Sequence, residues 1–271
     1  MPLAVCATPI GNLEDVTLRV LRELAEAAVV LCEDTRHTKG LLDRHGLSAM
    51  LLSYHRHNEA RRTTELLPRL ESGARMALVS DAGLPGVNDP GARLIAAALA
   101  AGVPVTVLPG PSAVETALVA SGLVGERYQF LGYLPRGEKA RGELWAELAQ
   151  WPHPAVAFES PQRLPGTLRS LAAAAPARRV AVCRELTKRF EEIVRGPAAQ
   201  VAERFGAPPK GEITLVVGAA EVVQERAEEH ASAAVAELIA AGVPRRQAVD
   251  VVARLARISR NTLYAESLKS R

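Results

Sequence analysis

The stretch Leu78-Val79-Ser80-Asp81-Ala82-Gly83-Leu84-Pro85-Gly86-Val87-Asn88-Asp89-Pro90-Gly91 joins an apolar segment to an alanine-rich one. Residues 76–79 are typical of a buried strand, and residues 92–101 of a helix. The stretch itself can be neither, because proline lacks a backbone donor and glycine resists a single conformation. A simple connector needs only about two to six residues. We therefore expect a ligand-binding loop at the carboxyl end of a strand in an open α/β sheet.

Three more loops follow apolar segments in the same way, at residues 8–12, 33–37 and 109–113. Strands and helices alternate over the first 120 residues, which predicts a mostly parallel sheet covered on both faces. The carboxyl ends of parallel strands share one edge, so we expect all four loops on one rim. No loop carries the glycine pattern of a dinucleotide site or of a nucleoside triphosphate site. Short side chains and exposed backbone favour a nucleoside without phosphates.

The chain divides into three expected domains. Residues 1–117 form the α/β lobe with the mostly parallel sheet, and residues 118–220 form a second α/β lobe with a mixed sheet. Residues 221–271 form a small basic helical domain, similar to a helix-turn-helix unit. Its residues 241–271 hold seven basic and two acidic side chains, whereas the whole chain has a net charge of +3. This balance excludes a cationic coat but permits a local basic patch, which suits phosphate contact.

Composition also indicates the cellular compartment of the protein. The three cysteines, Cys6, Cys32 and Cys183, are widely spaced and form no metal-binding pair. They predict a reducing compartment without a disulfide framework, and we expect no metal site. No apolar run reaches the roughly 18 residues of a membrane span, and the amino-terminal residues do not resemble a signal peptide. We expect a cytoplasmic protein that does not bind membranes.

Seven motifs together resemble the tetrapyrrole methylase superfamily. They lie at residues 7–12, 33–36, 80–91, 109–113, 158–164, 184–188 and 210–215. Within the superfamily they resemble the branch known as ribosomal RNA small-subunit 2′-O-methyltransferase I. The resemblance spans residues 3–218, and the tail is similar to the small helical domain of that branch. One departure is Gln162, where the branch has histidine, so no catalytic histidine is expected there.

The resemblance implies a two-lobed fold with S-adenosylmethionine in the cleft between the lobes. It also implies methyl transfer to the ribose 2′-oxygen of a cytidine in the decoding region of 16S ribosomal RNA, and a homodimer. Residue by residue, it assigns the cofactor site to Pro9, Ile10, Asp81, Gly83, Pro85, Ser112, Ala113, Phe158, Gly211, Glu212, Ile213 and Thr214.

A ribose hydroxyl is a weak nucleophile until its proton leaves, so a nearby proton acceptor would help catalysis. Glu33 and Asp34 are the first candidates, followed by Glu185 or Lys188 and then by His37. Asp34 beside Arg36 could instead form an ion pair that caps the next helix. The enzyme could also rely on orientation of the reactants alone.

Candidate RNA contacts come from three regions of the chain. Residues 54–58 combine an aromatic ring with cations, and residues 184–188 follow a predicted strand. The tail supplies the remaining cations, although it could instead be a docking or dimer-stabilising cap. The RNA candidates are Arg36, His55, Arg56, Arg184, Arg245, Arg246, Arg257 and Arg260.

Two other functions remain open on the sequence alone. One is methylation of a carbon atom of a porphyrin precursor on the same fold. The other is a non-catalytic RNA-binding assembly factor with a remnant of the cofactor pocket. The basic tail favours RNA over the first alternative, because a small tetracarboxylate does not require it.

Overall fold

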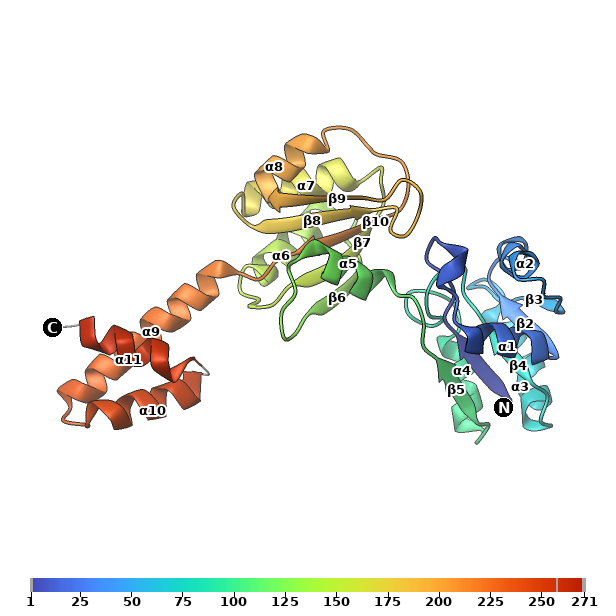
Figure 1. Cartoon of the computed structure of the whole chain (residues 1–271), viewed down its shortest axis with the longest axis horizontal. Coiled ribbons are helices and arrows are strands. Elements are labelled where there is room, and N and C mark those ends of the chain that lie inside the picture. The colour runs from blue at the N-terminus through green and yellow to red at the C-terminus, as the bar shows by residue number, and fades with distance from the viewer. Residues whose placement is uncertain (1, 257, 270–271) are drawn as a thin grey trace.

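The computed structural model describes residues 2–256 and 258–269, without the side chains of residues 221–228 and 269. Its first lobe is built on five parallel strands in the order β3-β2-β4-β1-β5 (Figure 1). The strands are β1 (Leu3–Cys6), β2 (Val29–Cys32), β3 (Leu51–Ser53), β4 (Met76–Leu78) and β5 (Val105–Leu108). The expected parallel sheet is therefore confirmed, and the loops after β1, β2, β4 and β5 leave it at one edge.

Helices cover both faces of this sheet. A short 3₁₀ helix, η1 (Leu13–Asp15), precedes α1 (Leu18–Glu26). Alternate strand residues point to opposite faces, so Ala4 and Cys6 pack with α1 and α2 (Thr35–Arg44). Leu3 and Val5 pack on the other face, with α3 (Glu59–Glu71) and α4 (Ala92–Ala100). Strands β1, β2 and β4 are buried and apolar throughout because neither of their faces meets water.

The second lobe is a mixed sheet in the order β6-β7-β10-β8-β9. Its strands are β6 (Gln129–Tyr133), β7 (Ala155–Glu159), β8 (Arg179–Arg184), β9 (Glu192–Pro197) and β10 (Ile213–Val217). Only β6 and β7 pair in parallel, and the other neighbours are antiparallel. The mixed sheet was expected, but β9 was not.

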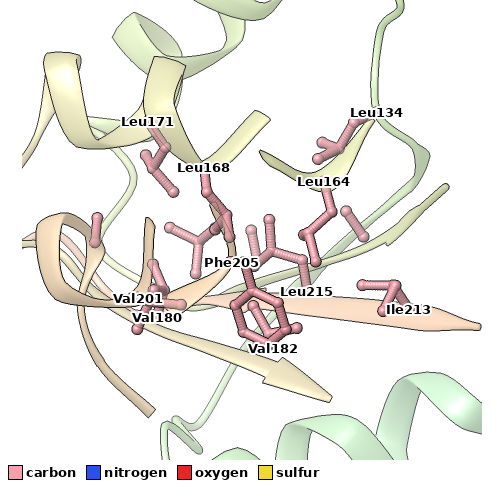
Figure 2. Packing of buried hydrophobic residues seen from close by; sticks show 14 of the residues in the cluster. Leu134, Leu164, Leu168, Leu171, Val180, Val182, Val201, Phe205, Ile213 and Leu215 are labelled. Carbon is pink, nitrogen blue, oxygen red and sulfur yellow. The ribbon is translucent and has the colours of Figure 1, made fainter. Parts of the chain in front are cut away.

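Three helices pack on one face of the second sheet: α6 (Glu138–Leu148), α7 (Leu164–Ala174) and α8 (Ala198–Arg204). Figure 2 shows Leu164, Leu168 and Leu171 of α7 directed toward the strands. Val182 and Leu215 meet them from the sheet, and both are fully buried. This core fixes the position of α7, whose first turn follows the end of β7.

Helix α5 (Ala113–Ser121) packs on the opposite face of the second sheet. Its residues Val114, Ala117 and Leu118 share a core with Val156 and Val216. The boundary expected at residue 117 falls inside this helix. By packing, α5 lies with the second lobe, because its apolar face is buried against that sheet rather than against the first one.

The tail consists of α9 (Glu221–Ala240), α10 (Arg245–Ala256) and α11 (Arg260–Lys269). Figure 1 shows the second lobe between the tail and the first lobe. The three helices have a core of their own, which includes Val235, Val249 and Leu263. Within the described part of the chain, no helix combines the length and apolar character needed to cross a bilayer.

Candidate functional site

A cavity of about 840 Å³ lies between the two lobes and is lined by all four rim loops. The first lobe contributes Ile10, Glu33 and residues 81–84, and residues 109–113 connect it to α5. The second lobe contributes Phe158 and residues 211–214. The strand-end loops that the sequence placed on one rim therefore meet at one cavity.

Backbone hydrogen bonds join two of the loops directly. Thr8 and Gly83 exchange N–H to carbonyl hydrogen bonds of 2.8 and 3.0 Å, and the Thr8 hydroxyl donates to the Ser80 carbonyl at 2.9 Å. Gly83 has φ +75°, a conformation that L side chains rarely adopt. A glycine here lets the loop turn back onto β1 and leaves its backbone open to the cavity.

Residues 185–188 attach the second lobe to the loop after β1. The Asn12 N–H donates to the Thr187 hydroxyl at 3.0 Å. A Cβ on Gly11 would lie 2.5 Å from Lys188 Cγ, so only glycine fits at this contact. One wall of the cavity thus depends on a close approach between the lobes.

Glu185 and Lys188, two of the catalytic candidates, are held in an ionic network. Glu185 Oε1 accepts from the Glu212 N–H at 3.0 Å and from Lys188 Nζ at 2.9 Å, and Lys188 Nζ also reaches Glu212 Oε2 at 2.9 Å. The Glu212 N–H and then the Lys188 ammonium lower the pKa of Glu185. Although burial opposes it, the partners Glu185 and Glu212 raise the pKa of Lys188. Both groups stay charged and suit positioning better than proton transfer.

A group of three carboxyl side chains lines the first-lobe side of the cavity: Glu33, Asp81 and Asp89. Burial and then the charge of Asp81 raise the pKa of Glu33. Burial, followed by the charges of Glu33 and Asp81, raises the pKa of Asp89 to about 6. The positive charge of Arg56 acts on both groups in the opposite direction. Asp89 was not among the sequence candidates, and it is the carboxyl group best suited to exchange a proton near neutral pH.

Asp34 does not line the cavity and instead caps α2. Its carboxylate accepts from the Arg36 N–H at 2.8 Å and pairs with the Arg36 guanidinium at 2.7 Å. The hydrogen bond from the Arg36 side chain holds the pKa of Asp34 well below its usual range. This is the capping ion pair left open as the alternative. Arg36 and His37 are exposed and do not line the cavity.

Ten of the twelve predicted cofactor residues line the cavity: Ile10, Asp81, Gly83, Ser112, Ala113, Phe158, Gly211, Glu212, Ile213 and Thr214. Pro9 and Pro85 do not. Gly211 has φ +96°, and a Cβ there would lie 2.4 Å from Glu185 Cγ. Sequence reasoning also missed an aromatic part of the wall. Phe158 stacks edge-on with Phe130 and Tyr133, with ring centroids 5.1 and 5.6 Å apart.

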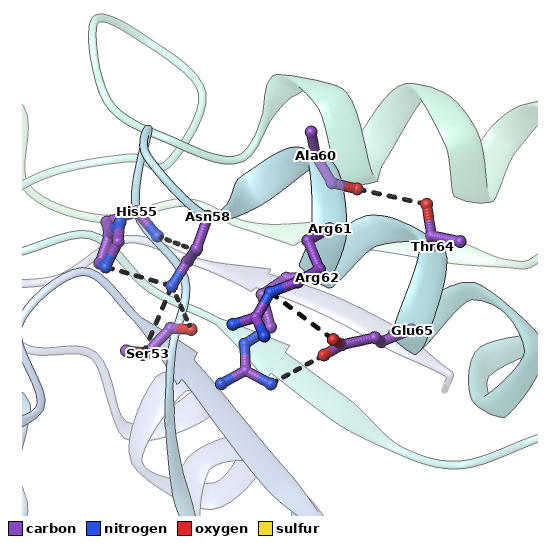
Figure 3. Close-up of polar contacts among 8 residues, drawn as sticks. All are labelled: Ser53, His55, Asn58, Ala60, Arg61, Arg62, Thr64 and Glu65. Atoms are coloured by element: carbon purple, nitrogen blue, oxygen red, sulfur yellow. Dashed lines mark hydrogen bonds and ion pairs between the residues drawn. The ribbon is translucent and has the colours of Figure 1, made fainter.

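The RNA candidates are spread over the surface. His55 lies beside Asn58, with 3.1 Å between His55 Nε2 and the amide nitrogen (Figure 3). The aromatic face expected at Tyr54 is wrong, because that ring is buried and its hydroxyl lies 3.0 Å from the Thr63 hydroxyl. Arg56 is exposed.

The other cations fall into two groups. Arg184 binds Glu192 at 2.9 Å and the Lys210 carbonyl at 3.2 Å, so it serves the second lobe internally. In the tail, Arg246 is exposed, Arg245 is half-buried and Arg260 pairs with Asp250. Arg257 lies outside the described residues.

A family model described as Tetrapyrrole (Corrin/Porphyrin) Methylases matches residues 2–202. The chain belongs to the tetrapyrrole methylase family. It is 44% identical to the "Ribosomal RNA small subunit methyltransferase I" of Halalkalibacterium halodurans, over 79% of this chain and 75% of that protein. The protein of the same name from Mesorhizobium japonicum is 41% identical, over 98% of this chain and 91% of the relative. The branch indicated by the motifs is therefore confirmed.

Solved tetrapyrrole methylases share the fold. The methyltransferase CobJ aligns with a TM-score of 0.61 and 22% identity, over 80% of this chain and 94% of that one. Uroporphyrin-III C-methyl transferase from Thermus thermophilus, complexed with S-adenyl homocysteine, aligns with a TM-score of 0.56 and 20% identity. That match covers 82% of this chain and 99% of the solved one.

S-adenosylmethionine is the methyl donor of the tetrapyrrole methylase family, and the cavity fits it. A volume of about 840 Å³ is within the range of small-molecule sites. The aromatic wall around Phe158 suits a nucleobase, and the open backbone at Gly83 and Gly211 can make hydrogen bonds. The carboxyl groups of Asp81 and Glu33 suit a positively charged group.

Proposed function

We propose that this protein transfers a methyl group from S-adenosylmethionine to the ribose 2′-oxygen of a cytidine in the decoding region of 16S ribosomal RNA. The observation that carries the proposal is 36–44% identity to proteins named for small-subunit ribosomal RNA methylation, most of them matched over nearly the whole chain. Such a substrate implies a cytoplasmic enzyme. We also propose that it acts as a homodimer.

The cavity residues have separate tasks in this reaction. The bound donor supplies an electrophilic methyl group on a sulfonium. Two sides of the cavity hold the donor. The second lobe contributes Phe158 and residues 211–214, and the first lobe contributes the loop of residues 81–84. A methyl transfer requires the acceptor oxygen to approach within about 3–3.5 Å, so a site built from two lobes can orient both reactants. The network of Glu185, Lys188 and Glu212 fixes the second-lobe loop of residues 185–188. Thr187 of this loop accepts a hydrogen bond from the Asn12 N–H of the first lobe.

A proton acceptor in the cavity would take up the proton of the ribose hydroxyl as the methyl group is transferred. Asp89 and Glu33 face the cavity with raised pKa values, and both are therefore better proton acceptors than an ordinary surface carboxylate. Asp34 is a weaker candidate because Arg36 occupies its carboxylate. We propose Asp89 as the proton acceptor, with Glu33 as the group that tunes it.

The test is methyl transfer from labelled S-adenosylmethionine to purified small ribosomal subunits and to their free RNA. Nuclease digestion and mass spectrometry should place the methyl group on one ribose 2′-oxygen of a cytidine. A base methylation, transfer to a porphyrin precursor, or no transfer to either ribosomal substrate would contradict the proposal. If no transfer occurs, calorimetric titration with S-adenosylmethionine distinguishes an inactive enzyme from an assembly factor, because a degenerate pocket would release no heat.

A further inference from the structure

A second cavity, of about 370 Å³, lies where the end of β6, α6 and the first turn of α7 meet. It is lined by four arginines, Arg136, Arg141, Arg163 and Arg169, together with Gln162 and Gly166. Among the described residues that line it, none is acidic. None of its arginines was an RNA candidate on the sequence.

Three of these arginines have no acidic partner among the described residues. Arg163 is committed, because it pairs with the buried carboxylate of Glu159 at 2.5 Å and donates to the Leu134 carbonyl at 3.0 Å. Within the described part of the chain, Arg136, Arg141 and Arg169 form no ion pair. Arg141 donates to the Arg136 carbonyl at 2.8 Å, but its Nε is buried and has no hydrogen-bond partner in the described structure. A buried guanidinium nitrogen without a partner points to a missing acceptor.

The first turn of α7 adds to the positive electrostatic potential of this cavity. Gln162, Arg163, Pro165 and Gly166 all line the cavity at the amino-terminal end of an 11-residue helix. The positive end of a helix favours anions, and Gly166 leaves the backbone accessible. Arginine is the side chain best matched to phosphate, because its planar guanidinium can make two parallel hydrogen bonds.

The linings of the two cavities meet at consecutive residues of the chain. Glu159, Ser160 and Pro161 line the cavity between the lobes, and Gln162 begins the lining of the arginine cavity. Consecutive Cα atoms are only about 3.8 Å apart, so the linings of the two cavities adjoin along one short loop. A nucleic acid strand with one ribose in the first cavity would bring its flanking backbone to the second.

We propose that the arginine cavity binds a backbone phosphate of the RNA substrate, next to the nucleotide that is methylated. This inference rests on the proposed function, because it takes RNA as the substrate. Its ligand is a phosphodiester, and its role is to position the strand independently of base sequence.

The test uses the full chain with Arg136→Gln and Arg169→Gln together, two exposed residues outside the methyl-transfer cavity. Binding of a small-subunit RNA fragment is measured by fluorescence anisotropy over a range of salt concentrations. We expect the Kd to rise about tenfold and the slope of log K against log salt to fall by about 0.7, since one phosphate on a single strand contributes roughly that amount. The affinity for S-adenosylmethionine and the thermal unfolding midpoint should stay unchanged.

The matched control is Arg22→Gln with Arg127→Gln, which removes the same charge from exposed positions outside both cavities. Its RNA affinity and salt slope should remain near those of the unmodified protein. Equal effects in the two double variants, or no effect in either, would overturn the inference while wild-type methyl transfer still supported the proposed function. Absence of methyl transfer by the unmodified protein would instead overturn the proposed function itself.

Discussion

At Asp89, burial and the neighbouring charges of Glu33 and Asp81 act together on one carboxyl group. Its pKa rises from 3.8 to about 6, so the folded chain holds this proton more tightly than the unfolded chain does. The free energy of unfolding therefore falls as the pH rises from about 4 to about 6, and the loss persists above that range. The charged carboxylate that catalysis needs is the form that the fold tolerates less well.

Replacing Asp89 with asparagine separates these two effects. At pH 7 the variant should be more stable than the unmodified protein by roughly 1 kcal/mol, a value reduced for partial solvent screening. At pH 4 this gain should disappear. Denaturant unfolding at both pH values measures it, with Asp43→Asn on the exposed face of α2 as the control. A stability difference that is equal at both pH values would contradict the account of this carboxyl group.

The same substitution should lower kcat and abolish the rise of rate with pH near 6, because the amide accepts no proton. Glu33→Gln should retain a rise but shift it to lower pH, since the pKa of Asp89 loses one of its causes. Rate profiles between pH 5 and 8 distinguish the two roles. If Asp89→Asn kept the profile of the unmodified protein, Asp89 would not be the proton acceptor.

At the scale of elements, Glu159 connects the end of β7 to the start of α7. Its buried carboxylate accepts from the Ser160 N–H and the Thr167 hydroxyl, both at 2.6 Å, and pairs with Arg163. Changing Glu159 to alanine should lower the free energy of unfolding by about 3 kcal/mol, because it leaves Arg163 without its partner in a largely buried place.

The control for Glu159 is Glu65→Ala on α3. Glu65 pairs with Arg61 and Arg62 at the surface (Figure 3), where an ion pair contributes about 0–1 kcal/mol. Chemical denaturation should therefore separate the two variants clearly. Equal losses would mean that the buried contacts of Glu159 do not hold α7 in place.

The elements also show what sequence reasoning can and cannot reach. Apolar runs such as β2 and β10 were predicted because buried strands of both lobes consist almost entirely of such residues. Strand β9 was missed, since Glu192-Ile-Val-Arg-Gly-Pro197 is partly exposed and carries proline and glycine. The placement of α5 was missed because its local sequence does not say which sheet it will cover.

The candidate site, like the elements, was predicted in part from the sequence. Motifs predicted most of the cavity lining, since loops at strand ends must share one rim. They did not single out Asp89 among the carboxyl groups of its loop, because a raised pKa depends on neighbours from other loops. They suggested an exposed aromatic ring at Tyr54, although its hydroxyl reaches Thr63 inside the first lobe.

For the whole molecule, the tail is separable from the two lobes because it has its own core. Deleting residues 222–271 should therefore leave the affinity for S-adenosylmethionine unchanged and raise the KM for small ribosomal subunits. An unchanged KM would show that the tail is not an RNA-binding element.

The central claim is that the cavity between the lobes holds the methyl donor, and calorimetric titration with S-adenosylmethionine tests it most directly. The comparison is Gly83→Val in the cavity wall with Gly102→Val beyond the end of α4, where φ is +73° and an added Cβ meets nothing within 4 Å. Both variants carry a similar backbone strain, since Gly83 has φ +75°. We expect one binding site in the unmodified protein and in Gly102→Val, and loss of binding in Gly83→Val. Undiminished binding in Gly83→Val, or no binding in the unmodified protein, would contradict the account.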